Sequence, residues 1–219
     1  MTDQNTTRTG LCLASHSPRR RSLLERLGVP FFVQSAGHDV EEAVLAQGRG
    51  EEAEQVALSR ARAKGLAVAA DLSKKPEFQS CPVLSADTVV HLGTELLDKP
   101  EGPEQARRFL QSLSGKEHGV VTAVCLLHQG KERTLWRRTW VEFGVLSDAM
   151  IEAYIATGEP FDKAGGYGIQ GVGGALVHSI RGCYFNVMGL PVRDTAMLLS
   201  ESGIAWALDS GGEGLGSEA

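Results

Sequence analysis

The segment from residue 11 to residue 30 joins a short apolar strand to a helix that begins with three arginines. Leu11–Ala14 has the composition of a buried strand. Ser17 is a favourable N-cap, and Pro18 occupies the first helical position, where its missing N–H costs nothing. Arg19–Arg21 then fall in the first helical turn, where a cation opposes the helix dipole by about 0.3–1 kcal/mol. An anion bound there, held by free N–H groups and guanidinium groups together, would relieve this repulsion.

Two interpretations of this turn stay open. A basic helix end that is simply exposed to solvent is common. The strand–Ser–Pro–Arg context favours a phosphate site, with Arg19 and Arg20 as its ligands. On that interpretation, replacing either arginine by alanine leaves the stability of the ligand-free protein unchanged or slightly raised, because the substitution removes a repulsion.

Size and charge limit the classes of protein that fit. The chain has 219 residues, of which 42% are hydrophobic and 22% charged, enough for one large α/β domain or two small ones. Its formal net charge of −5 argues against general binding to nucleic acid or to an acidic membrane, because both need a basic face. The positive charge that matters is therefore expected to be local, as in a pocket for a small anion.

The cysteines and the N-terminal residues favour a reducing compartment. Cys12, Cys81, Cys125 and Cys183 lie far apart, without a metal-ligand spacing. Cys12 and Cys125 fall within apolar runs, which predicts buried thiols. The first ten residues are polar without an apolar signal region, and no run approaches the roughly 18 apolar residues of a membrane span. We expect a cytoplasmic protein.

Strand and helix patterns alternate along the chain. Apolar spacing predicts helices over 18–27, 51–70 and 103–113 and from residues 147 and 191, and strands over 31–34, 83–92, 95–97, 119–127, 134–143 and 175–180. Hairpins combined with crossover helices predict an α/β fold with a mixed, partly antiparallel sheet flanked by helices. Residues 1–9 and 209–219 are small and polar, so we expect disordered ends around a single domain over 10–208.

An isolated carboxylate interrupts a strongly apolar strand. Asp87 lies within Val83–Leu92, where its burial is costly unless the carboxylate is paired, hydrogen-bonded or bound to a metal. A structural aspartate bonded to nearby amides is the alternative. Lys99 follows the next hairpin and could return beside Asp87, although alone it would be an ordinary surface lysine.

A glycine-rich segment carries the second dense group of polar residues. Residues 158–174 hold seven of the 26 glycines in the chain, together with Glu159, Asp162, Lys163 and the isolated amide Gln170. Such a segment can be a plain flexible loop. A long glycine-rich loop with charges and one amide is more often functional, because the backbone there can approach a ligand closely.

The order and spacing of these motifs resemble the Maf family of nucleoside triphosphate pyrophosphatases from about residue 11 to residue 203. The matching motifs are Ala14-Ser-His-Ser-Pro-Arg-Arg20, Ser85-Ala-Asp-Thr-Val-Val90, Lys99-Pro100, Leu113-Ser-Gly115 with His118, Gly158-Glu-Pro-Phe-Asp-Lys-Ala-Gly-Gly-Tyr-Gly-Ile-Gln-Gly171 and Val187-Met-Gly-Leu-Pro191. The resemblance implies two lobes around a deep cleft, like that of inosine triphosphate pyrophosphatases. It also implies a homodimer and a divalent cation, Mg²⁺ or Mn²⁺.

The resemblance also implies a role for each matching position. The substrate-binding residues would be Ser15, Arg19, Arg20, Lys64, Thr88, Lys99 and Gln170. Asp87 would act as general base on the attacking water or as a metal ligand, with Glu42 as a second carboxylate near the metal. Attack at the α-phosphorus would release pyrophosphate and a nucleoside monophosphate.

Two positions resemble one branch of the family. Thr88 and Gln170 look like the branch acting on dTTP and UTP, whereas a sister branch resembling a 7-methyl-GTP pyrophosphatase carries Glu where Gln170 stands. A neutral amide offers both a donor and an acceptor, which matches the O4 and N3–H of a uracil-type edge. The alternatives are the sister activity, or a nucleotide-binding regulator of cell division with little turnover.

Overall fold

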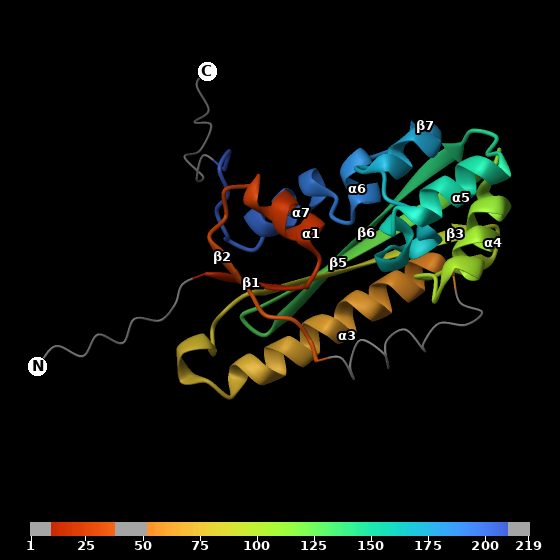
Figure 1. Cartoon of the computed structure of the whole chain (residues 1–219). Helices are drawn as coiled ribbons and strands as arrows, with labels where there is room; N and C mark the ends of the chain where they lie inside the picture. The colour runs from red at the N-terminus through yellow and green to blue at the C-terminus, as the bar shows by residue number, and fades with distance from the viewer. Residues whose placement is uncertain (1–9, 38–51, 210–219) are drawn as a thin grey trace, which may run out of the picture.

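A seven-stranded sheet with helices on both faces organises the chain (Figure 1). The computed structural model describes residues 10–37 and 52–209. Of the ends expected to be disordered, 1–9 and 209–219, all but Asp209 lie outside these residues, as does Glu42. Among the described helices, none combines the length and apolar character needed to cross a bilayer.

The strands and helices alternate largely as the apolar spacing predicts. The strands are β1 (Leu11–Ala14), β2 (Phe31–Val33), β3 (Val83–Leu92), β4 (Glu95–Leu97), β5 (Glu117–His128), β6 (Lys131–Phe143) and β7 (Val177–Arg181). The helices are α1 (Pro18–Glu25), α3 (Ala53–Ser73), α4 (Pro103–Leu113), α5 (Asp148–Ala156), α6 (Tyr184–Met188) and α7 (Val192–Ser200). Short 3₁₀ helices η1 (Pro76–Phe78), η2 (Glu159–Asp162), η3 (Ala164–Gly166) and η4 (Val172–Leu176) join them.

The sheet is mixed, which confirms the predicted fold class. Its order is β2-β1-β3-β5-β6-β7, and β4 pairs with β3. β1 runs parallel to β2 and β3, whereas β3, β5, β6 and β7 pair antiparallel. The predicted strand over 175–180 begins later, at Val177, because Gly174 N–H donates to Gly171 O at 3.1 Å and holds the preceding residues in a 3₁₀ turn.

One edge of β3 is open at its centre. β1 pairs with Val83–Ser85 and β4 pairs with Val90–Leu92, both on the side of β3 that faces away from β5. Between these two pairings, no described strand covers residues 86–89 on that side. Successive side chains alternate across a strand, so Asp87 points to the face covered by α3, and Thr88 points to the opposite face.

The helices divide the molecule into two lobes. The α1 lobe packs α1 and α7 on the sheet around Leu13, Leu23 and Leu199, whereas α3 covers the opposite sheet face (Figure 1). The α4–α5 lobe packs those two helices around the far ends of the long strands, with Leu110 and Ile151 in its core. The open edge of β3 lies where the two lobes meet, which confirms the expected two-lobed architecture.

Candidate active site

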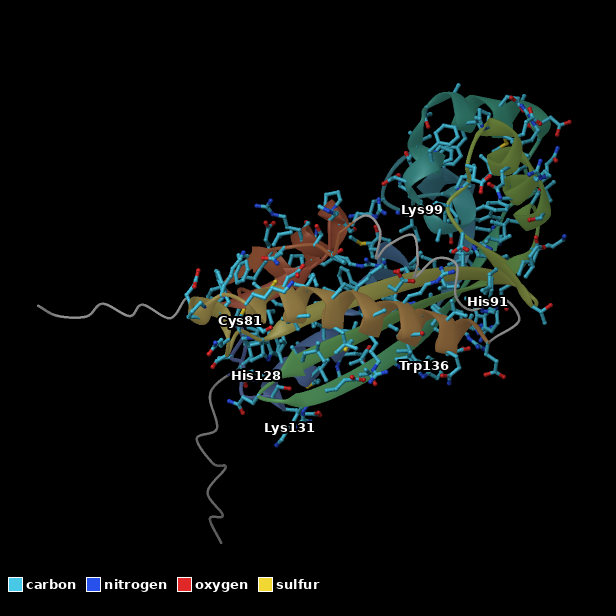
Figure 2. All side chains as sticks on the ribbon, turned by 90° about the horizontal axis from the view of Figure 1, so that it is seen from below. Cys81, His91, Lys99, His128, Lys131 and Trp136 are labelled. Carbon is cyan, nitrogen blue, oxygen red and sulfur yellow. The ribbon has the colours of Figure 1, made fainter. Side chains whose placement is uncertain are left out.

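A cavity of about 610 Å³ opens between the two lobes beside the uncovered edge of β3. The described residues that line it include five lysine and arginine side chains and three carboxylates, so its wall is locally cationic in a chain of net charge −5. Figure 2 shows Lys99 on the side of the α4–α5 lobe, away from the β5–β6 hairpin that His128 and Lys131 mark. The predicted local concentration of positive charge is therefore present.

Asp87 is held by a lysine from the helix behind the sheet. Lys64 Nζ, on α3, donates to Asp87 Oδ1 at 2.6 Å, and the two side chains are 14% and 8% exposed. The pair is thus largely removed from water, where removing either partner leaves an uncompensated charge. Helix α3 can approach this closely because Gly65 sits over Ser85, whose hydroxyl donates to Ala61 O at 2.7 Å.

The second oxygen of Asp87 has no donor. Oδ2 is buried and accepts no hydrogen bond within residues 10–37 and 52–209. A buried carboxylate oxygen without a partner is costly, so the site fits a further group such as a water or a hard cation. No set of three His, Cys, Asp or Glu side chains in the described part of the chain is arranged to hold a metal on its own.

Arg20 is held by protein groups on three sides. Its Nε donates to Gly189 O at 2.8 Å and its Nη2 to Thr88 Oγ1 at 3.0 Å, with a longer contact of 3.4 Å from Nη1 to Ser15 Oγ. Ser15 Oγ also accepts from Ser17 N at 3.2 Å. From these contacts we expect that removing Arg20 destabilises the ligand-free protein, whereas the helix dipole alone predicts no loss of stability.

Arg19 reaches across the mouth of the cavity. Its Nη1 contacts Asp162 Oδ2 at 3.1 Å, so α1 and the glycine-rich segment are joined by an ion pair. Asp162 also accepts from Lys163, whose Nζ donates in addition to Glu159 O at 2.6 Å. Burial alone would raise the pKa of Asp162, but the hydrogen bonds from Lys163 and Arg19 hold this pKa below its ordinary value. Arg19 therefore pairs with the carboxylate of Asp162, whereas the sequence predicts a phosphate as its partner.

The position of Lys99 is set by its neighbour. Asp98 accepts from the buried Arg60 of α3, with distances of 2.6 Å to Oδ1 and 3.3 Å to Oδ2. The carbonyl of Asp98 accepts from Gly165 N at 3.2 Å. This residue therefore ties α3, Lys99 and the glycine-rich segment together.

Glu159 organises the loop that carries Gln170. Its carboxylate accepts from Tyr154 OH at 3.0 Å, Val172 N at 2.9 Å and Gly173 N at 3.2 Å. A Cβ on Gly171 would lie 2.2 Å from Glu159 Oε2, so only glycine fits there. The loop is therefore an ordered structure rather than a plain flexible linker, and it leaves the exposed Gln170 on the cavity wall.

A buried histidine contacts Tyr167 of the same glycine-rich segment. His118 Nε2 lies 2.8 Å from Tyr167 OH, and both rings pack edge-on against Phe143. Burial lowers the pKa of His118 to about 4. The imidazole is therefore neutral at pH 7, and this contact is a neutral hydrogen bond.

Comparison with known proteins places the chain in a family. The family model for Maf-like proteins matches residues 10–202. This chain belongs to the Maf family. Three relatives, each named dTTP/UTP pyrophosphatase, come from Anaeromyxobacter dehalogenans (46% identity, 88% of this chain and 94% of the relative), Halalkalibacterium halodurans (43%, 89% and 97%) and Chromobacterium violaceum (44%, 91% and 98%).

The Maf fold brings all the predicted site residues that are described to one cavity. The lining includes Ser15, Arg19, Arg20, Lys64, Asp87, Thr88, Lys99 and Gln170. Sequence reasoning missed the anchoring role of Glu159, the Arg60–Asp98 pair and the buried Thr122 behind Thr88. Thr122 carried a usable signal, because it is a polar residue flanked by the apolar runs Val120–Val121 and Ala123–Leu127.

Proposed function

We propose that this chain is a dTTP/UTP pyrophosphatase that hydrolyses these nucleotides to the monophosphate and pyrophosphate. The observation that carries the proposal is the Asp87–Lys64 pair on the wall of a cationic cavity, with one carboxylate oxygen left without a donor. A pure binding site for an anion does not need a carboxylate on its wall, whereas hydrolysis needs a group that accepts a proton from water. The names of the three relatives support the same activity.

The proposed roles follow from the side of the cavity on which each residue lies. Arg19, Arg20 and Lys99 hold the triphosphate by charge and directed N–H groups. Asp87 accepts the proton of the attacking water, whose oxygen forms a bond to the α-phosphorus as the bond to pyrophosphate breaks. Lys64 keeps the Asp87 carboxylate oriented, at 2.6 Å from Oδ1, so that Oδ2 is left for the water. Such a site works by positioning and charge stabilisation.

A divalent cation fits this arrangement through oxygen ligands. Asp87 Oδ2 would hold it together with phosphate oxygens of the substrate, and Glu42 is proposed as a second carboxylate. When bound, Mg²⁺ or Mn²⁺ would neutralise charge that develops on the phosphates. Asp87 Oδ2 is thus proposed either as the base for the attacking water or as a ligand of the cation.

The base is proposed to be read by Gln170, whose amide lies on the wall formed by the glycine-rich loop. The test is a comparison of kcat/KM for dTTP, UTP, CTP, GTP and 7-methyl-GTP with Mg²⁺ or Mn²⁺. The proposal expects the highest values for dTTP and UTP. A preference for 7-methyl-GTP would assign the sister activity, and stoichiometric binding without turnover would assign a regulator.

Two further properties are proposed with this function. The homodimer implied by the family is tested by light scattering after size-exclusion chromatography, where a monomeric mass would contradict it. A cytoplasmic location is supported by the fully buried thiols of Cys12 and Cys125, whose pKa values burial raises to about 12 and about 11. Cell fractionation with a compartment marker tests the location.

A further inference from the structure

We propose that Thr122, which does not line the cavity, is a positioning residue that fixes the guanidinium of Arg20 through Thr88. Thr122 is fully buried on β5, directly opposite Thr88 in the sheet register. The two hydroxyl oxygens are 2.9 Å apart, and Thr88 Oγ1 in turn lies 3.0 Å from Arg20 Nη2. Thr122 is thus one hydrogen bond removed from a residue that contacts the arginine.

The direction of this chain of hydrogen bonds is determined by counting protons. Thr122 Oγ1 lies 2.8 Å from the carbonyl oxygen of Asn186, which can only accept. The single hydroxyl proton of Thr122 is therefore used there. Thr88 must then donate its own proton to Thr122, which leaves a lone pair of Thr88 Oγ1 directed to Arg20. Without the Thr122 oxygen as acceptor, the hydroxyl proton of Thr88 loses the partner that directs it away from Arg20.

The acceptor at the end of the chain is itself rigidly placed. Asn186 Nδ2 donates to Val120 O at 2.9 Å and to Thr139 Oγ1 at 3.0 Å, so α6 is fastened to β5 and β6. Helix α6 ends at Gly189, whose carbonyl accepts from Arg20 Nε at 2.8 Å. Two of the acceptors of Arg20, Thr88 Oγ1 and Gly189 O, are therefore positioned by the same buried network.

The inference rests on the proposed role of Arg20 as a phosphate ligand, and it is tested by removing one hydroxyl. Thr122→Val keeps the shape and removes the hydroxyl that accepts from Thr88 and donates to Asn186 O, whereas Thr122→Ser keeps that hydroxyl. Thr195→Val is the matched control, because Thr195 is equally buried and its hydroxyl has no partner among the described residues. We expect Thr122→Val to raise the KM for dTTP and the Kd for inorganic tripolyphosphate about 10-fold, with kcat changed less than about 3-fold. Thr122→Ser and Thr195→Val stay near wild type.

A second readout needs no substrate. In protein labelled with ¹⁵N-arginine, the Nε–H signal of Arg20 is assigned from its loss in Arg20→Lys. We expect the Nε–H proton to exchange with water faster in Thr122→Val than in the wild type, and at the wild-type rate in Thr122→Ser. Wild-type exchange and wild-type KM in a folded Thr122→Val protein would overturn the inference. Absence of triphosphate turnover in the wild type would instead refute the proposed function. If Thr122→Val does not fold, Thr122→Cys keeps a similar volume with a weaker acceptor and donor, and an intermediate exchange rate is expected.

Discussion

The two arginines at the start of α1 are expected to differ in how much stability the protein loses when each is replaced by alanine. Both lie in the first helical turn, where a cation opposes the helix dipole by about 0.3–1 kcal/mol. Arg20 is compensated by neutral acceptors, Gly189 O at 2.8 Å and Thr88 Oγ1 at 3.0 Å. Within residues 10–37 and 52–209, the hydrogen-bond and ion-pair partner of Arg19 is Asp162, whose side chain is 61% exposed.

These contacts set the size of the expected effects. A hydrogen bond to a charged group contributes about 1.5–3 kcal/mol, so losing two in Arg20→Ala, less the relieved dipole repulsion and partial replacement by water, costs about 2–4 kcal/mol. For a chain of this length that lowers Tm by about 5–10 °C. An exposed ion pair contributes about 0–1 kcal/mol, which the relieved repulsion offsets, so Arg19→Ala shifts Tm by less than about 2 °C.

The assay is thermal unfolding of the ligand-free proteins at one salt concentration, supported by urea unfolding to obtain the free energy. Arg19→Ala serves as the matched control for Arg20→Ala. Equal Tm values for the two variants would refute the argument, because they would show that the acceptors of Arg20 contribute no net stability. With dTTP present, both variants are expected to show a raised KM.

Three further predictions concern neighbouring residues. Burial holds the pKa of His118 near 4, so the folded state favours the neutral imidazole. This preference contributes about 2–3 kcal/mol to the free energy of unfolding, which is complete above pH 6.5 and is lost as pH falls toward 4. The wild type should therefore lose more free energy of unfolding over that range than His118→Gln, and parallel pH curves for the two proteins would contradict this. Asp162→Asn removes the competitor for Arg19 and should lower KM for dTTP about 2- to 5-fold, whereas a raised KM would show that Asp162 aids binding. Gln170→Glu should lower kcat/KM for dTTP, with a loss of transition-state stabilisation of about 1–2 kcal/mol relative to wild type. An unchanged substrate ranking would show that Gln170 does not read the base.

The sequence predicts the elements of this fold well where a local pattern determines them. Ser17 caps α1 as expected, accepting from Arg20 N at 3.4 Å, and Cys12 and Cys125 are fully buried. Asp87 was recognisable because a carboxylate in an apolar strand needs a partner. The pairing with Lys64 was not predicted, because no local spacing relates a strand to a helix 23 residues earlier, and Lys99 was the lysine expected beside Asp87.

Contacts between distant segments could not be predicted from the sequence. Two acceptors of Arg20 lie 68 and 169 residues away, so the helix dipole alone gives a stability effect of the opposite sign to the one that these contacts predict. The short helix α6 was missed because five residues are too few for an apolar period to show. Glu159 was noticed as a charge, but its role depends on the backbone N–H groups of Val172 and Gly173, which only the folded loop directs toward it.

The most direct test of the central claim is identification of the products formed from dTTP by the wild type and by Asp87→Asn. The isosteric amide keeps the packing of β3 but cannot accept the proton of water. The account predicts dTMP and pyrophosphate from the wild type, and a kcat at least about 100-fold lower in a folded Asp87→Asn protein that still binds dTTP. Release of orthophosphate with dTDP, or a wild-type rate in Asp87→Asn, would contradict the assignment of Asp87 as the group that drives attack at the α-phosphorus.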